Sequence, residues 1–293
     1  MRKPLRPEAY AAVMATGIVS AAASSAGRPV LSDVLFSLAA AAYVVLPFRV
    51  RPERAFSLFA FTAAGDVLAT RAATEGWEAI ALGVWALDAA AWLAFATWLA
   101  RRPPPRRTAR GSWLLAVVAT QSLALVAGVL AERDALQAAR RLGVALFVLG
   151  VVLYPIVVAL LVPRLRRLAR GDERIAGDDW ILLGALAISS LTATHVGVPN
   201  AVALALWVAA LVWAPALVVA ELRSLPLRYD TRRWSTVFPL GMFASASYAV
   251  GVDVVGAVVV WVALAAWVAT SVGAVTSVWE AAAPRIVRRK SSA

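Results

Sequence analysis

Three ionisable side chains stand out because they lie within or beside long apolar runs. Asp66 and Asp88 sit inside such runs, and His195, the only histidine, follows Thr194 near the end of another. An ionised carboxylate is costly in a membrane, so Asp66 is expected to be protonated, paired with an arginine or engaged in proton coupling. A structural hydrogen bond is the simpler role for both aspartates and for His195, and pH sensing or substrate contact is the alternative for His195.

The spacing of these groups does not favour metal binding or hydrolysis. The chain has no cysteine, which excludes disulfides and thiolate ligands. No second metal ligand is arranged near His195. The sequence also has no two-histidine helix motif, no pair of carboxylates at catalytic spacing and no supported serine nucleophile. We therefore expect no cofactor, no metal and no enzymatic activity.

The stretch Trp234–Met242 suggests control of passage through a membrane. Pro239 lacks an N–H and crowds the preceding turn, so the helix is expected to kink there, with Gly241 close by. A carbonyl freed by proline is tolerated where it lines a cavity, but not where it faces lipid. Phe238 is then a candidate plug of a pore. The plainer interpretation is an ordinary proline-kinked membrane helix in which Phe238 packs on a neighbour.

The composition indicates that these residues lie on membrane helices. The chain has 293 residues, of which 61% are hydrophobic, and its mean hydropathy is +0.76. The apolar residues fall in long runs, which is typical of a polytopic membrane protein. We expect an all-α integral membrane fold in one domain, 1–293, with ten transmembrane helices. The expected segments are residues 8–26, 30–48, 55–70, 77–100, 113–131, 142–162, 180–196, 200–220, 234–250 and 254–279.

The basic residues orient these segments. With the N-terminus in the cytoplasm, 24 of the 29 basic residues fall in inner segments, which agrees with the positive-inside rule. The other five, in outer loops, are Arg28, Arg71, Arg133, Arg140 and Arg141. A multi-pass protein of the cell membrane with both termini cytoplasmic is therefore predicted, and the Arg- and Ala-rich composition suggests a bacterial source. The net charge of +12 reflects orientation, and no nucleic-acid binding is expected.

The segments pair into five similar hairpins, which favours a quasi-five-fold ring around a central pore over two halves of five. The hairpins span approximately 8–48, 55–100, 113–162, 180–220 and 234–279. The odd-numbered helices carry most of the polar residues, so they are expected to form the inner wall. The candidate pore-lining or kink residues are Thr16, Gly17, Ser20, Thr62, Gly65, Asp66, Thr120, Gln121, Ser122, Ser189, Pro239 and Gly241. Ordinary packing of small residues between helices is the alternative.

The distribution of charge favours an anion path. All odd helices would run from the inside outwards, so the positive ends of their dipoles would face the inner mouth. The inner loops also carry a large excess of basic over acidic residues, whereas the outer loops do not. Such a field concentrates anions at the inner mouth.

Three stretches resemble marked motifs of the tellurite-resistance/C4-dicarboxylate transporter family, which includes slow-type anion channels. They are residues 13–20, residues 117–122 and Trp234–Met242. The resemblance covers essentially the whole chain, because the number of spans, their orientation and the short outer loops also match. It implies five hairpins in a quasi-five-fold arrangement, a pore lined by the odd helices and a homotrimer. It further implies a gating phenylalanine at the position of Phe238 and a close-packed glycine at Gly17.

Two functions follow from these observations. The first is a passive anion channel or permease that passes small inorganic or organic anions and is gated by Phe238. The second is a proton-coupled secondary transporter of a dicarboxylate, sulfite or tellurite-like oxyanion that uses Asp66. A carrier built as two inverted halves and a membrane enzyme are weaker alternatives. The expected partners are small anions and the lipid bilayer. A wall of Ser, Thr and Gly discriminates weakly between anions, so the substrate stays open.

Overall fold

The described part of the chain, residues 9–46, 56–133, 138–224 and 229–290 of a computed structural model, is helical throughout apart from short turns. This confirms the all-α prediction. The α-helices are α1 (Tyr10–Ser25), α2 (Pro29–Val45), α3 (Phe59–Thr74), α4 (Glu78–Arg101), α5 (Leu115–Glu132), α6 (Ala139–Arg170), α7 (Ile181–His195), α8 (Asn200–Arg223), α9 (Trp234–Ala249) and α10 (Asp253–Lys290). Short 3₁₀ turns are η3 (Phe56–Leu58), η4 (Arg106–Thr108), η5 (Gly111–Leu114), η6 (Gly177–Trp180) and η7 (Thr231–Arg233).

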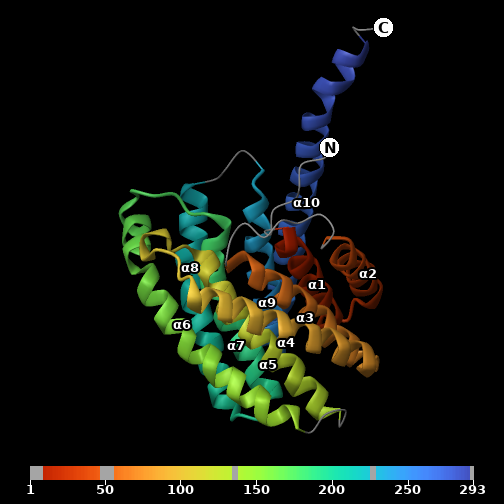
Figure 1. The fold of residues 1–293 in the computed structure, drawn as a ribbon, viewed down its shortest axis with the longest axis vertical. Helices are drawn as coiled ribbons and strands as arrows, with labels where there is room; N and C mark the ends of the chain where they lie inside the picture. The colour runs from red at the N-terminus through yellow and green to blue at the C-terminus, as the bar shows by residue number, and fades with distance from the viewer. Residues whose placement is uncertain (1–8, 47–55, 134–137, 225–228, 291–293) are drawn as a thin grey trace.

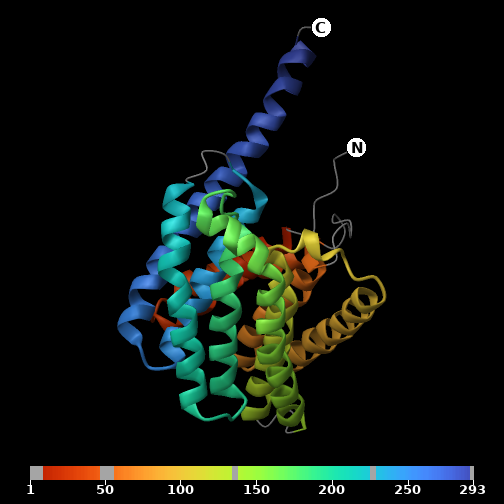
Figure 2. The ribbon, with the colours of Figure 1, turned by 90° about the vertical axis from the view of Figure 1, so that its left-hand side faces the viewer.

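Each α-helix lies on one of the apolar segments predicted from the sequence. The largest differences are at two C-terminal ends. Helix α6 continues past the predicted end at residue 162 and stops at Gly171, which has a φ of 82°, and α10 continues to Lys290. Arginine is a good helix former, so a basic stretch lengthens a helix beyond its apolar part. In Figures 1 and 2, α10 extends well beyond the other helices.

Five helices in the described residues are long and apolar enough to cross a membrane: α4, α5 together with η5, α6, α8 and α10. By contrast, α1, α3, α7 and α9 have 15 or 16 residues each. At 1.5 Å per residue they are about 24 Å long, which is shorter than a hydrocarbon core of about 30 Å. Neighbouring helices surround these short ones, so the thickness of the lipid does not dictate their length.

Four of the five hairpins have the same backbone conformation at the turn between their two helices. The glycine just after α1, α3, α7 and α9 has a φ of 69°, 85°, 80° and 78°, respectively, a conformation that favours glycine. After α1, Gly27 N–H donates to the Ser24 carbonyl, and the next N–H donates to the Ala23 carbonyl. This pattern caps a helix and reverses the chain. The glycines are Gly27, Gly76, Gly197 and Gly251. Their shared geometry supports the interpretation of the hairpins as structural repeats.

The odd-numbered helices form the centre of the molecule and the even-numbered helices its outside. Contacts between odd helices run in cyclic order, from α1 to α3, α5, α7, α9 and back to α1. Each even helix packs chiefly on its hairpin partner. In the most apolar 18-residue stretch of η5 and α5, 94% of the residues are buried, whereas the corresponding share is 17–22% in α4, α6, α8 and α10. A layer of apolar side chains therefore faces outwards, as a lipid-facing surface requires.

Two glycines let neighbouring odd helices approach closely. A Cβ added at Gly17 of α1 would lie 2.8 Å from Cγ1 of Val67 on α3, and one at Gly241 of α9 would lie 2.9 Å from Cγ2 of Ile18 on α1. Small residues at such contacts bring helix backbones together in membranes. Helix α9 is continuous through Pro239, and the kink expected there stays a prediction.

Candidate functional site

A cavity of about 380 Å³ lies between the odd helices, towards their C-terminal ends. All five odd helices contribute to its wall. Its rim includes the exposed residues Ser25, Thr74 and Ala249, so the cavity reaches the surface of the molecule. The lining residues are Ile18, Ala21, Ser24, Ser25, Val67, Thr70, Arg71, Thr74, Ser122, Leu125, Ile188, Leu191, His195, Met242, Ser245, Tyr248 and Ala249.

The lining side chains follow one stripe along each helix. On α3 the stripe is Val67, Thr70, Arg71 and Thr74, with the i, i+3, i+4, i+7 spacing of a single helix face. On four helices the deep end of the stripe is apolar, at Ile18, Val67, Ile188 and Met242, and on α3 the outer end is polar, at Arg71 and Thr74. On α5 the order is reversed, with Ser122 deep and Leu125 further out. A solute would therefore pass a mouth that holds Arg71 and Thr74 and reach a mostly apolar floor that includes the Ser122 hydroxyl.

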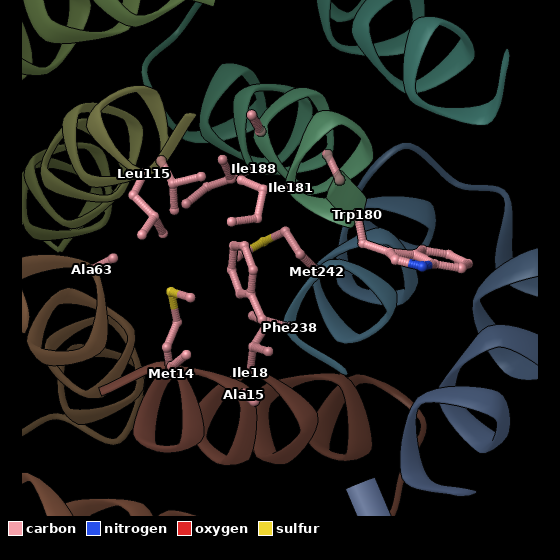
Figure 3. Packing of buried hydrophobic residues seen from close by; sticks show 14 of the residues in the cluster. Met14, Ala15, Ile18, Ala63, Leu115, Trp180, Ile181, Ile188, Phe238 and Met242 are labelled. Carbon is pink, nitrogen blue, oxygen red and sulfur yellow. The ribbon is translucent and has the colours of Figure 1, made fainter. Parts of the chain in front are cut away.

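Below the floor, the same five helices bring apolar side chains together and close the axis. This central apolar block consists of Met14 from α1, Ala63 from α3, Leu115 from α5, Ile181 from α7 and Phe238 from α9. All are buried, and Phe238 is 0% exposed. Figure 3 shows the phenyl ring of Phe238 directed into the space that these helices surround.

Phe238 lies one turn before Met242, which lines the cavity, and therefore on the same face of α9. Its ring packs against α7 at Gly184, where an added Cβ would lie 3.0 Å from Cε1 of Phe238 and 3.0 Å from Cγ of Pro239. Gly184 is a residue that sequence reasoning missed, because a glycine within a helix carries no signal of what it faces.

The mouth of the cavity holds two basic side chains, each beside acidic partners. Arg71 pairs with Asp33 at 3.2 Å and also with Glu75. His195 Nδ1 lies 2.8 Å from Glu132 Oε2. Arg71 was expected to be an outer-loop charge, and its place in the cavity wall was not predicted. Its spacing from Val67 and Thr74 on one helix face could have indicated this position.

Several polar residues predicted to line a pore form hydrogen bonds between odd helices and even ones. Thr16 Oγ1 accepts a hydrogen bond of 2.9 Å from Trp267 Nε1 on α10, and Thr120 Oγ1 accepts one of 3.0 Å from Trp92 Nε1 on α4. Ser20 donates to the Ser32 carbonyl on α2 at 2.7 Å, and Gln121 donates to the Phe147 carbonyl on α6 at 3.2 Å. These groups contact the outer layer of helices.

The remaining predicted residues are dispersed. Ser189 donates to the Ala185 carbonyl of its own helix at 2.7 Å. Thr62 is buried, and its hydroxyl has no partner among the described residues. Gly17, Gly65, Pro239 and Gly241 pack closely against neighbouring helices. Of the residues predicted to line a pore, Ser122 is the one that lines the cavity.

Ser122 connects the cavity to a buried acidic pair. Its Oγ lies 3.1 Å from Asp66 Oδ2 on α3 and 3.1 Å from the Ala119 carbonyl oxygen. Asp88 on α4 accepts a hydrogen bond of 2.9 Å from the hydroxyl of Tyr43 on α2. Both aspartates are 0% exposed. No arginine in the described residues pairs with either carboxyl group, so the arginine partner considered for Asp66 is not found there.

The opposite end of the molecule is held by an ionic cluster outside the expected spans. Arg164 donates to Asp179 through two nitrogens, at 2.9 and 2.7 Å, and also pairs with Glu173. Nearby, burial and then the neighbouring Asp179 raise the pKa of Asp178. Burial would also raise the pKa of Asp230, but hydrogen bonds from Arg232 outweigh it and hold that pKa below its usual range. The cluster links the helix ends next to the central apolar block.

Comparison with known proteins supports a membrane role. A family model described as "voltage-dependent anion channel" matches residues 55–275. The chain is also similar to proteins of two Mycobacterium tuberculosis strains, both described as an uncharacterized membrane protein. In each case the identity is 32% over 145 residues, which covers 41% of this chain and 74% of the relative.

Proposed function

The chain belongs to the voltage-dependent anion channel family, and on that premise we propose that it is a membrane channel for small anions, gated by Phe238. Membership of the family supports an anion transport role in a lipid membrane. The pathway proposed here is the axis enclosed by α1, α3, α5, α7 and α9. Its closed point is the central apolar block.

One observation carries the proposal: the cavity and Phe238 lie on the same helix faces, one behind the other. Phe238, Met242, Ser245 and Ala249 follow one stripe of α9, and the last three line the cavity. An anion that passed the mouth and Ser122 would reach the side chains of the central apolar block, where it would have to lose water without gaining a hydrogen bond. Such a constriction conducts when its side chains move aside.

The orientation of the pathway rests on the distribution of basic residues. With cytoplasmic termini, the N-terminal ends of the odd helices face inwards and the cavity opens on the outer side. The positive ends of the helix dipoles then lie at the inner mouth, and Arg71 and His195 lie at the outer mouth. The positive dipole ends at the inner mouth suit an anion, whereas at the outer mouth Arg71 and His195 are offset by their carboxylate partners. Assembly as a homotrimer, and the choice among chloride, dicarboxylate, sulfite and tellurite-like anions, belong to the same proposal.

A second candidate is a proton-coupled transporter that uses Asp66. It is favoured by the single hydrogen bond that separates Asp66 from the cavity-lining Ser122. The channel is the better supported of the two, because the odd helices make a closed cycle of contacts. Alternating access needs two bundles that rock against each other.

Anion flux into liposomes containing the purified protein tests the gate. Phe238→Ala is expected to raise chloride flux strongly over a nearly silent parent. Phe243→Ala is the matched control: Phe243 is a buried phenylalanine of the same helix, but it stacks on Trp207 of α8 at 5.5 Å between ring centroids. Its removal leaves the central block in place. Equal flux from the two variants would refute Phe238 as the gate.

A further inference from the structure

The acidic pair behind the cavity wall poses a problem of hydrogen-bond donors. Ser122 has one hydroxyl proton and two acceptors at 3.1 Å, the Asp66 carboxyl group and the Ala119 carbonyl. If Asp66 is ionised, a buried negative charge has a single donor, the Ser122 hydroxyl, which it shares with the Ala119 carbonyl of helix α5, and this is unfavourable. If Asp66 is protonated, its O–H donates to Ser122 Oγ, Ser122 keeps its hydrogen bond to the Ala119 carbonyl, and no charge is buried.

The second carboxyl group adds to the same problem. Asp66 Oδ1 and Asp88 Oδ2 are both buried without a partner among the described residues. The two groups lie on adjacent helices beside Gly65, where an added Cβ would lie 2.8 Å from Asp88 Cγ and would also contact the hydroxyl of Tyr43. Two ionised carboxylates so placed, with no cation, would repel each other strongly.

Within the described ranges, no basic group pairs with either carboxyl group to offset a negative charge. Helix α2 contributes Tyr43, and α4 contributes Asp88. Tyr10 of α1, whose ring packs on Phe61, is the titratable residue from that side. The sequences of α1 and of α5 before Glu132 contain no charged residue. On α3 itself, the nearest charge is Arg71 at the cavity mouth, which is already paired with two carboxylates.

We propose that Asp66 and Asp88 form a proton-binding site, and that the proton held there keeps the wall of the cavity neutral so that anions can enter. This rests on the proposed function, since it concerns the same cavity. Loss of the proton would place a negative charge one hydrogen bond behind Ser122 and repel an anion at the cavity floor. The ligand of this site is the proton itself, taken from water.

The presence of the proton can be tested without any transport. Infrared spectra of the protein in liposomes at neutral pH would distinguish a carboxylic acid from a carboxylate by the C=O stretching band. Asp66→Asn is expected to remove a band of a protonated acid, and Asp88→Asn is expected to remove or shift one. Asn keeps the shape of the side chain, and its amide can still donate to Ser122. Spectra identical to the parent in the acid region for both variants would overturn the proton-binding site.

The effect on anions is measured in the Phe238→Ala background, where the path is open. Chloride flux is expected to fall about tenfold between about pH 5 and about pH 9, because a buried negative charge repels the anion. Adding Asp66→Asn should hold the flux at the low-pH level throughout. Glu78→Gln, which removes a carboxyl group from the first turn of α4, should leave the pH dependence intact.

The two readouts separate the two proposals. The same pH dependence with and without Asp66→Asn would overturn the control of anion entry by this site. Absence of flux in every variant would overturn the proposed channel, and the infrared bands would still decide by themselves whether the pair holds a proton.

Discussion

Gly184 of α7 leaves just enough room for the ring of Phe238 of α9, because a Cβ at Gly184 would come 3.0 Å from Cε1 of the ring. The added Cβ would also come 3.0 Å from Cγ of Pro239. The proline ring is fixed to the backbone and has no other rotamer that would avoid this contact. The position of the proposed gate thus depends on a missing side chain on the neighbouring helix.

Gly184→Ala is therefore expected to displace the Phe238 ring and to raise chloride flux above the parent, though less than Phe238→Ala does. The double variant Gly184→Ala/Phe238→Ala should conduct no more than Phe238→Ala alone, since the methyl group then has no ring to displace. Liposome flux assays on the three variants measure this. If the increases in flux of the two single variants added up in the double variant, Gly184 would act on conduction by a route other than the Phe238 ring.

Gly65→Ala is expected to be severely destabilising. The new methyl group would overlap the carboxyl group of Asp88 and the hydroxyl of Tyr43, which are joined by a partly buried hydrogen bond. A loss of about 2–4 kcal/mol is expected for overpacking combined with a broken buried contact. Thermal unfolding in detergent measures it. Gly83→Ala, on the exposed face of α4 with nothing within 4 Å of the added Cβ, should be neutral or stabilising by about 0.5–1 kcal/mol.

Two threonines should matter for stability and not for conduction. Thr16→Val and Thr120→Val remove acceptors of the Trp267 and Trp92 indole N–H groups, at a cost of about 1 kcal/mol each. Neither threonine lines the cavity, so chloride flux in the Phe238→Ala background should be unchanged. Ser122→Val, which alters the cavity wall, should change the flux. If the threonine variants changed the flux and Ser122→Val did not, the placement of the anion path along the cavity would be wrong.

The pH dependence of stability should carry opposite signs at two aspartates outside the spans. The pKa of Asp178 is raised in the folded protein, chiefly by burial. Its contribution to stability is therefore fully present below the ordinary carboxyl pKa of about 3.9 and is lost as the pH rises through the raised value. Asp178→Asn, which can still accept from the Ser112 N–H, should raise the melting temperature at pH 8 and have little effect at about pH 3.

Asp230 should behave in the opposite way. Its pKa is lowered in the folded protein by Arg232, against the effect of burial. Its stabilisation is present above the ordinary carboxyl pKa and disappears as the pH falls through the lowered value. Asp230→Asn should thus lower the melting temperature at neutral pH and lose this effect in strong acid. Scanning calorimetry of the two variants across pH measures these changes. A change of melting temperature with the same sign in both variants at neutral pH would contradict the opposite pKa shifts of Asp178 and Asp230.

The positions of the helices could be predicted because long apolar runs separated by glycine and arginine leave few alternatives. The direction in which each polar side chain points could not be predicted in the same way. Thr16, Thr120 and Ser189 each donate a hydrogen bond to the carbonyl four residues earlier in their own helix, so a hydroxyl in a membrane helix needs no polar surroundings. Their polarity therefore did not identify the inner wall.

The cavity is more visible in the spacing of residues than in their polarity. Val67, Thr70, Arg71 and Thr74 share one face of α3, and that face could have been identified from the sequence. The contact between Gly184 and Phe238 depends on how two helices pack, which periodicity along one helix does not specify. The acidic pair is similar, because Asp66 is far from Ser122 in sequence and Asp88 is far from Tyr43, and these contacts form only in the folded chain.

The cavity opens at one end of the odd helices and is closed at the other by the central apolar block. A bulky anion that fits the mouth but not the block would lodge there when added on the cavity side and would have no binding place when added on the other side. Inhibition of this protein should thus be sided, and the side on which such a blocker acts would reveal how the molecule is inserted in the membrane.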